Sequence, residues 1–278
     1  MPIPTYARTC AGVILGIIGL RIPCRPSPRG GSGRAVESIE VHMPAVILIT
    51  GANRGLGLEF VKQYAEAGWR VIACARALPD AAALQELAAR HANISLESLD
   101  VGVPEQIDSL AVRLAGQPID VLLNNAGWLG DRQKQSFAEL DYATFEEVLR
   151  INTYAPLAMA RAFMPNVLAG MQKKIVVITS GLSSLTNTSR FGNLYFYRLS
   201  KAAVNMAMRT LQAEVRGQGV KVGILAPGMV DTRLLRNSGY EGPGVIEAPQ
   251  SVAAVMRHIE TLTQEAEMTL YTGEKLPW

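Results

Sequence analysis

A short apolar segment that leads directly into a glycine-rich turn and then a helix constrains this sequence most. Residues 45–50 are almost continuously apolar, as in a buried parallel strand. The glycines of residues 51–57 allow tight bends and close approach of the backbone to a ligand. The helix expected over residues 56–68 offers free N–H groups and partial positive charge at its start, which suits a pyrophosphate. The segment therefore predicts a nucleotide-binding unit, although an ordinary strand-to-helix turn would look similar.

The spacing of the glycines narrows the choice of nucleotide. The pattern is GxxxGxG rather than the GxGxxG of other dinucleotide-binding folds. The P-loop pattern, which ends in Gly-Lys-Ser/Thr, is absent, so ATP and GTP are disfavoured.

Apolar runs and segments with helical spacing alternate along the rest of the chain. Further strands are expected over residues 70–75, 94–99, 119–123, 174–179, 220–226 and 268–271, and helices over 80–90, from 104 onward, 142–168 with a bend or break at Pro156, 197–216 and 249–262. Repeated β-α-β units with right-handed crossovers predict one α/β domain over residues 44–278. We expect a doubly wound, Rossmann-type, mostly parallel seven-stranded sheet in three αβα layers.

The net positive charge of the chain comes from its N-terminal end. Residues 1–43 hold five arginines, no lysine and two acidic residues, and so account for the whole formal net charge of +3. The neutral remainder argues against a nucleic-acid partner, which would need a basic face. With 49% hydrophobic and 18% charged residues, the chain has ample material for a core.

The N-terminal 43 residues differ from the rest, and we expect them to be a disordered extension. The apolar run at residues 11–20 is too short to cross a bilayer, so no membrane association is expected. Residues 23–34 are rich in Pro, Arg, Gly and Ser. Three interpretations remain: a targeting peptide, a disordered appendage, or a stretch upstream of a natural start at Met43.

The cysteines and histidines show none of the spacings typical of disulfide frameworks or metal sites. The three Cys make no CxxC pair or disulfide framework, which favours a reducing compartment and a cytoplasmic protein. The three His have no ligand spacing, so no metal site is expected.

The end of the second strand bears on the choice of dinucleotide. A carboxylate there would bind the adenosine ribose hydroxyls. This chain has no acid before Asp80, and Arg76 follows the strand directly. Guanidinium groups match phosphate oxygens in bidentate geometry, so Arg76 and Arg54 would suit a 2′-phosphate. The pattern favours NADP(H), and the alternative is two solvated arginines.

Tyr197 and Lys201 supply the candidate acid–base chemistry. At i and i+4 they project from one helical face, and we expect the ammonium to lower the pKa of the phenol. A phenol tuned in this way can act as a general acid or base. Such pairs also occur by chance on many helices. Their place after strand 174–179, at the edge that also bears the glycine turn, favours a catalytic role.

In this combination the motifs resemble the short-chain dehydrogenase/reductase family over residues 43–278. The matching positions are Thr50–Gly57, Asp100-Val101, Asn124-Asn125-Ala126-Gly127, Asn152, Ser180, Tyr197-x-x-x-Lys201 and Pro227-Gly228. Residues 180–184, residues 197–205 and the final Leu-Pro-Trp resemble the C-factor/sniffer-like carbonyl-reductase branch.

The resemblance implies a role for each matching residue. Tyr197 would exchange a proton with the substrate oxygen, Ser180 would hold that oxygen, and Lys201 would lower the pKa of Tyr197 and bind the nicotinamide ribose. Asn152 would position a water behind Lys201. The expected cofactor contacts are Gly51, Asn53, Arg54, Gly55, Leu56, Gly57, Arg76, Asp100, Val101, Asn124, Ala126, Gly127, Tyr197, Lys201, Pro227, Gly228, Val230 and Thr232. Structural interpretations remain for Asn152, as a tie between helix backbones, for Asp100, as a loop cap, and for Asn125.

The serine spacing departs from the family pattern. Ser180 lies farther from Tyr197 than is usual in the family, and Ser184 sits at the commoner spacing. We prefer Ser180 because it lies at the end of its strand, with a small insertion in the loop that follows. Ser184 is the alternative.

The expected activity is NADPH-dependent reduction of a lipophilic aldehyde or ketone, or the reverse oxidation. The segments expected over the substrate, residues 128–136, 181–196 and 229–246, are rich in Leu, Met and aromatic residues, and the last has enough glycine for a mobile lid. A nucleotide-binding signalling protein without turnover is the main alternative, and a Rossmann-like methyltransferase is a weaker one. The resemblance also implies a homodimer or homotetramer, formed through residues 142–168 and 197–216.

Overall fold

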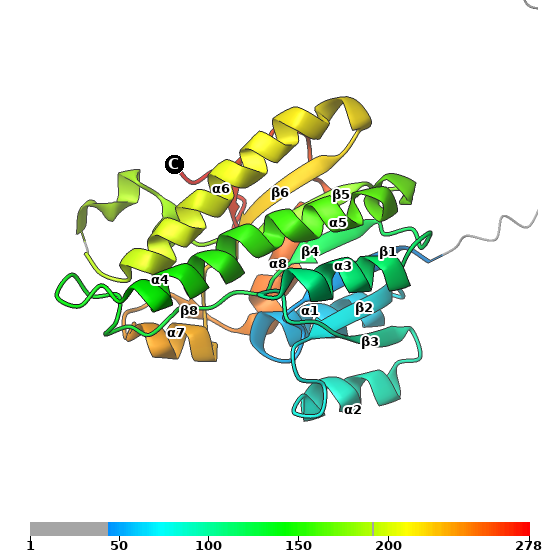
Figure 1. The fold of residues 1–278 in the computed structure, drawn as a ribbon, viewed down its shortest axis with the longest axis horizontal. Helices are drawn as coiled ribbons and strands as arrows, with labels where there is room; N and C mark the ends of the chain where they lie inside the picture. Colours follow the sequence, from blue (N-terminus) through cyan, green and yellow to red (C-terminus); the bar gives the residue numbers. More distant parts are fainter. Residues whose placement is uncertain (1–43, 191) are drawn as a thin grey trace, which may run out of the picture. The chain divides into compact units, whose positions relative to one another are not determined.

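The structure, a computed structural model, describes residues 44–190 and 192–278 (Figure 1). The predicted N-terminal extension and the start at Met43 therefore lie outside the described residues. Within the described part, no helix has the length and apolar character needed to span a bilayer.

Seven parallel strands form the central sheet in the order β3-β2-β1-β4-β5-β6-β9. The strands are β1 (Val46–Thr50), β2 (Arg70–Ala75), β3 (Ile94–Ser98), β4 (Val121–Asn124), β5 (Lys174–Ile178), β6 (Lys221–Ala226) and β9 (Met268–Leu270). This arrangement confirms the predicted seven-stranded Rossmann-type sheet. Two short strands, β7 (Met229–Val230) and β8 (Val245–Ile246), pair in a second sheet that was not predicted, because two residues carry no detectable period.

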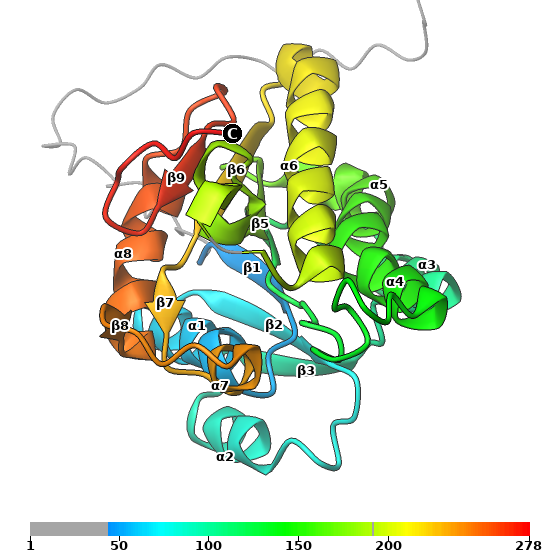
Figure 2. The ribbon, with the colours of Figure 1, turned by 90° about the vertical axis from the view of Figure 1, so that its left-hand side faces the viewer.

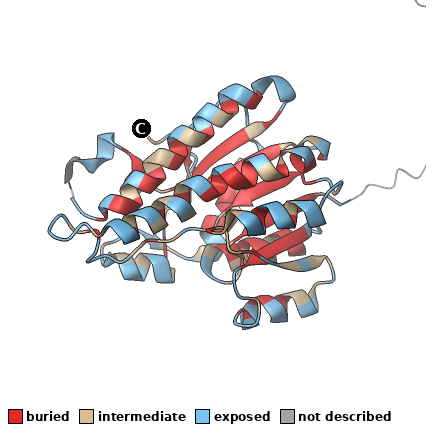
Figure 3. Ribbon diagram, viewed as in Figure 1, coloured by how far each residue is buried: buried red, intermediate tan, exposed pale blue. Residues whose placement is uncertain are grey.

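Helices cover both faces of the sheet (Figure 1). They are α1 (Gly55–Glu66), α2 (Ala82–Arg90), α3 (Pro104–Arg113), α4 (Tyr142–Leu149), α5 (Ala155–Ala169), α6 (Tyr195–Val215), α7 (Arg233–Ser238) and α8 (Ala248–Glu260). Alternate strand residues point to opposite faces. In β1, Ile47 and Ile49 pack with α1, α2 and α8, whereas Val46 and Leu48 pack with α3, α5 and α6. The sheet is thus buried on both sides, as Figure 3 shows in red.

The long helix expected over residues 142–168 is two helices joined by an irregular turn. Between α4 and α5 the backbone forms a π-helical turn over Arg150–Tyr154. The backbone stays helical from α4 through this turn into α5, and Pro156 is the second residue of α5. The irregularity predicted at Pro156 is therefore a π-helical turn that ends just before it and contains Asn152. A π-helical turn in such a place often marks a functional site.

The carboxyl ends of the strands form the edge that carries the site. The chain adds β2 and β3 on one side of β1, then returns to β4 on the other side, so the order of strands reverses between β1 and β4. Ligands of open α/β sheets bind at such a switch point. Figure 2 faces this edge, with α7, β7 and β8 in the foreground.

The opposite edge is tied together by one buried carboxylate. The Oδ2 atom of Asp120 accepts the N–H of Val46 at 2.8 Å. Its Oδ1 atom accepts the N–H groups of Met171 at 2.8 Å and Gln172 at 3.1 Å. Asp120 therefore joins the starts of three neighbouring strands.

Asp120→Ala should lower the free energy of unfolding by about 3 kcal/mol, because buried N–H groups lose a charged acceptor. Urea denaturation of the cofactor-free protein measures the change. Asp108→Ala is the matched control, since its ion pair with Arg161 is exposed and should contribute less than about 1 kcal/mol. Equal losses in the two variants would contradict the role given to Asp120.

Candidate active site

The glycine turn has no room for side chains at two positions. A Cβ atom on Gly57 would lie 2.1 Å from the carbonyl oxygen of Gly51 and 2.6 Å from Nδ2 of Asn125. Gly51 has φ +67°, and its Cβ would lie 2.8 Å from the Cα of Ala126. The turn thus folds directly onto the loop after β4. Helix α1 begins at Gly55 without a side-chain cap, which leaves its first N–H groups for a ligand.

Thr50 and Asn125 hold this turn against the neighbouring loop. The Thr50 hydroxyl accepts the N–H groups of Asn125 at 3.1 Å and Ala126 at 3.0 Å. The Asn125 amide donates to the carbonyls of Thr50 at 2.9 Å and Gly51 at 3.2 Å. These bonds agree with the structural interpretation of Asn125.

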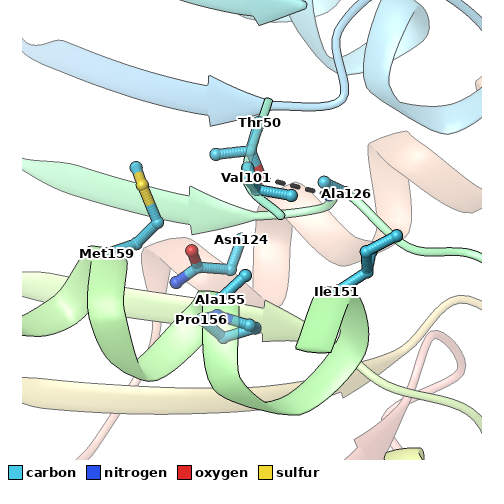
Figure 4. Close-up of a pocket in the computed structure, with 8 residues that line it drawn as sticks. All are labelled: Thr50, Val101, Asn124, Ala126, Ile151, Ala155, Pro156 and Met159. Carbon is cyan, nitrogen blue, oxygen red and sulfur yellow. Dashed lines mark hydrogen bonds between the residues drawn. The ribbon is translucent and has the colours of Figure 1, made fainter. Parts of the chain in front are cut away.

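Asn124 has an unused donor at the switch point. It is buried, and its Nδ2 atom has no hydrogen-bond partner, the one such side-chain atom found among the described residues. Figure 4 shows Asn124 facing α5 across a small pocket. The pocket is lined by Thr50, Val101, Asn124, Ala126, Ile151, Ala155, Pro156 and Met159. A buried donor without a partner costs free energy, which makes Asn124 an exception among the buried side chains described.

Three arginines gather beside the glycine turn. Burial lowers the pKa of Arg54, and the charges of Arg233 and Arg76 lower it further. Arg76 is exposed, and its Nη1 atom lies 4.0 Å from Oδ2 of Asp100. The cluster therefore has an excess of positive charge, which an anion would relieve. Arg233 was not predicted to belong to it, because it lies far from Arg54 in the sequence.

Asp100 makes bonds of its own. Its Oδ1 atom accepts the N–H of Gly102 at 2.9 Å, which bears out the loop-cap interpretation. Val101 follows it and reaches the pocket of Asn124.

The segment after β6 returns to the glycine turn. Gly228 has φ +85° and packs on the ring of Tyr271, where a Cβ would come within 2.7 Å. Val230 is buried in β7, and Thr232 begins α7 by accepting the N–H of Leu235. A Cβ on Gly55 would lie 3.5 Å from Cγ2 of Thr232. The structure therefore brings Thr232 over the glycine turn at Gly55.

Tyr197, Lys201 and Ser180 meet at the end of β5. Tyr197 and Lys201 are buried on α6, and Nζ of Lys201 lies 5.9 Å from the centroid of the Tyr197 ring. Nζ donates to the carbonyl of Ile178 at 2.8 Å, at the end of the strand that leads to Ser180. A Cβ on Gly127 would lie 3.6 Å from Nζ, so this glycine leaves space beside the ammonium.

The pKa values differ from the sequence-based expectation. Burial raises the pKa of Tyr197 to about 12, and a hydrogen bond with the Ser180 side chain partly offsets the rise. Burial also lowers the pKa of Lys201 to about 8. The net shift of the Tyr197 pKa is therefore upward, opposite to the expected direction, because desolvation outweighs the effects that lower it.

Asn152 occupies the π-helical turn and is fully buried. Its Oδ1 atom accepts the N–H of Trp128, and Nδ2 donates to the carbonyl of Trp128, both at 2.8 Å. Nδ2 also donates to Ser200 Oγ at 2.9 Å. These bonds agree with the interpretation of Asn152 as a tie between backbone segments. They join the loop after β4 to α6, and the Oδ1 atom lies close to Gly127.

Ser180 and Ser184 have different surroundings. Ser180 is half-buried beside the Tyr197 phenol, and its Oγ accepts the N–H of Leu182 at 3.2 Å. Ser184 is buried, and its Oγ accepts the N–H of Asn187. The segment between β5 and α6 forms two 3₁₀ turns, Gly181–Ser183 and Thr186–Arg190.

Two buried amides that sequence reasoning missed also support the site. Oε1 of Gln135 accepts the N–H of Tyr197 at 3.1 Å, while Nε2 donates to the carbonyl of Leu129 at 2.8 Å. Asn205, one turn beyond Lys201, bonds to Thr179 and Ser183. Only the helical spacing of Asn205 from Tyr197 and Lys201 was visible in the sequence.

No cluster of metal-binding side chains accompanies these groups. In the described part of the chain, no three His, Cys, Asp or Glu residues lie close enough to hold a metal ion.

Comparisons with known proteins agree with this geometry. The family model "short chain dehydrogenase" matches residues 45–241. C-signal of Myxococcus xanthus is 34% identical over 174 residues, which are 61% of this chain and 99% of that protein. The NADPH-bound carbonyl reductase from chicken fatty liver has a TM-score of 0.77 at 28% identity, covering 85% of this chain and 100% of that one. The carbonyl reductase Sniffer of D. melanogaster has a TM-score of 0.75 at 27% identity, with the same coverage.

The chain therefore belongs to the short-chain dehydrogenase family, a family of oxidoreductases. Its likeness to C-signal and to carbonyl reductases, Sniffer among them, confirms the resemblance inferred from the motifs.

The buried ammonium should make stability depend on pH. Lys201 titrates near 8 in the folded protein and near 10.5 when unfolded. Between these values the unfolded chain binds more protons, so folding becomes more favourable as the pH rises. From pH 7.5 to 10, the free energy of unfolding of the parent should rise by about 2 to 3 kcal/mol relative to that of Lys201→Met. Urea denaturation of cofactor-free protein measures it.

Lys62→Met, a change at an exposed lysine of α1, is the control and should follow the parent. A parallel pH dependence of the parent and Lys201→Met would mean that burial does not shift Lys201.

Proposed function

We propose that this protein transfers a hydride between NADPH and the carbonyl of a lipophilic aldehyde or ketone, with Tyr197 as the general acid and base. One observation carries the proposal: the buried phenol of Tyr197 adjoins Ser180 at the edge that also bears the glycine turn. NADPH supplies the hydride when it is bound, and the chain supplies binding, orientation and the proton.

The described residues fit a dinucleotide. The turn at Gly51 and Gly57 leaves the backbone bare, and the start of α1 suits a pyrophosphate. Asn124 offers a buried donor without a partner. Gly127 leaves space beside Lys201 for a ribose. The remaining proposed contacts are Asn53, Arg54, Gly55, Leu56, Arg76, Asp100, Val101, Ala126, Pro227, Gly228, Val230 and Thr232.

The arginine cluster supports NADP(H) over NAD(H). The charges of Arg233 and Arg76 both act against the charge of Arg54, and a 2′-phosphate would relieve this repulsion. NADP-bound and NADPH-bound relatives with the same fold add to this support.

The direction of the pKa shift suits reduction. A pKa raised to about 12 keeps the Tyr197 phenol protonated at neutral pH, so it can donate to a carbonyl oxygen. Lys201, with its pKa lowered to about 8, remains mostly charged at pH 7 and stabilises the phenolate that forms when the proton leaves. Asn152 holds the loop of Trp128 against α6 and would keep this pair in place.

Ser180 is the proposed group that holds the substrate oxygen. Its side chain bonds to Tyr197, whereas the hydroxyl of Ser184 accepts a backbone N–H within its own turn. The preference for Ser180 over Ser184 therefore gains support from geometry.

Apolar side chains surround Tyr197 and support a lipophilic substrate. Leu129, Leu194 and Tyr197 form a small cluster with Leu182 packed against it. A signalling role without turnover is the second candidate, and it gains no support from a site that keeps Tyr197, Lys201 and Ser180 together.

We also propose that residues 44–278 act as one domain in a homodimer or homotetramer located in the cytoplasm. Apolar side chains exposed on the surface of the π-helical turn, α5 and α6 support assembly: Tyr154, Leu157, Leu199 and Met206. The free, buried Cys74 agrees with a reducing compartment.

Tyr197→Phe should lower kcat for carbonyl reduction by at least about 100-fold, because the proton donor is lost. The rate of NADPH oxidation with a panel of aromatic aldehydes measures it, and NADPH binding should persist. Tyr195→Phe, an exposed tyrosine at the start of the same helix, should retain activity. Equal turnover by Tyr197→Phe and the parent would refute the mechanism, and binding without turnover by the parent would favour the signalling role.

Arg76→Glu should weaken NADPH binding about 10- to 100-fold and leave NADH binding nearly unchanged, because one charged contact to a 2′-phosphate is lost. Dissociation constants from cofactor fluorescence test this. Arg70→Glu, an exposed arginine at the opposite end of β2, is the matched control and should bind both cofactors as the parent does. An unchanged ratio of the two constants in Arg76→Glu would remove Arg76 from the site.

A further inference from the structure

Helix α6 carries three buried polar side chains at successive turns. Tyr197, Lys201 and Asn205 stand at i, i+4 and i+8 and expose 5%, 4% and 3% of their surface. The proposed mechanism uses the first two and leaves the third without a role. Asn205 lies on the same helical face as the proposed acid–base pair, so its hydrogen bonds are of interest.

Asn205 reaches both sides of Ser180. Its Oδ1 atom accepts the hydroxyl of Thr179 at 2.6 Å, one residue before Ser180. Its Nδ2 atom donates to the hydroxyl of Ser183 at 2.8 Å, three residues after it. All three of these side chains are buried, so the bonds are shielded from water.

Ser183 in turn bonds to the backbone of Ser180. Oγ of Ser183 donates to the carbonyl oxygen of Ser180 at 2.6 Å, and the N–H of Ser183 donates to the same oxygen at 3.0 Å. The Ser180 side chain in turn accepts the N–H of Leu182. Asn205 thus fixes the chain on either side of Ser180, through Thr179 and Ser183.

The last strand of the sheet completes this network. Nδ2 of Asn205 also lies 3.4 Å from Sδ of Met268, and Oγ of Ser183 lies 3.2 Å from it. Figure 2 shows the segment after β5 between α6 and β9. The turn that carries Ser180 is therefore held by contacts with both α6 and β9.

We propose that Asn205 is a positioning residue that holds the Ser180 hydroxyl against the Tyr197 phenol. The inference rests on the proposed function, in which Ser180 holds the substrate oxygen. A displacement of about 1 Å at a reacting group can cost about 100-fold in rate, so the network around Ser180 would be felt in catalysis.

Asn205→Leu tests the proposal against a matched control on the same helix. Gln212→Leu also removes a buried amide, whose bonds go to the backbone of Val220 and Val222, far from Ser180. Asn205→Leu should lower kcat about 10- to 100-fold. It should leave the dissociation constant for NADPH within about twofold of the parent value. Gln212→Leu should change neither quantity, although both variants should lose stability.

Hydrogen exchange gives a readout that does not depend on turnover. The amides of residues 182–184 should exchange at least about tenfold faster in Asn205→Leu and at the parent rate in Gln212→Leu. If Asn205→Leu does not fold, Thr179→Val and Ser183→Ala each remove one arm of the network with little change of volume. Both should then show the same loss of kcat.

A Ser180→Ala background decides whether the effect passes through Ser180. There, Asn205→Leu should cause no further fall in kcat, because coupled residues are not additive. An additive fall, or a fall no greater than that of Gln212→Leu, would overturn the proposal. A parent that binds NADPH but reduces no carbonyl would overturn the proposed function. The exchange comparison would then still decide whether Asn205 holds the turn, and equal exchange in the two variants would show that it does not.

Discussion

Parallel pairing of all seven strands places every strand's carboxyl end on one edge of the sheet, and each part of the site depends on that. The glycine turn follows β1, the loop of Ala126 and Gly127 follows β4, and Ser180 follows β5. Each crossover connection leaves its strand at this edge, so the loops that follow the strands lie next to one another. The amino edge is instead closed by a single carboxylate, Asp120, which accepts three backbone N–H groups.

Features with a local signature were predictable from sequence. The glycine turn is contiguous, and Tyr197 and Lys201 are one turn apart, so short patterns sufficed. The contacts of Gln135 and Asn205 were not predictable, because their partners lie 62 and 26 residues away. The π-helical turn at Asn152 has no sequence period that separates it from a regular helix. Arg233 joins Arg54 only through the fold of the segment after β6.

Burial shifts the pKa values of the two ionisable groups of the site, Tyr197 and Lys201, in opposite directions. It keeps the Tyr197 phenol protonated, which suits a proton donor, and it destabilises the charge on Lys201. The buried charge of Lys201 therefore lowers the stability of the folded protein. Active sites often retain such unfavourable groups because function needs them. The carbonyl of Ile178 offsets part of this cost by accepting a hydrogen bond from the ammonium.

The contacts of Met268 make the turn that carries Ser180 depend on a strand that is distant in sequence. Ser183 and Asn205 both lie within hydrogen-bond range of its sulfur, and β9 pairs with β6. β9 follows the other six strands of the central sheet along the chain. A change that loosens β9 from β6 would therefore also loosen the turn that carries Ser180, although the two segments are far apart in the sequence.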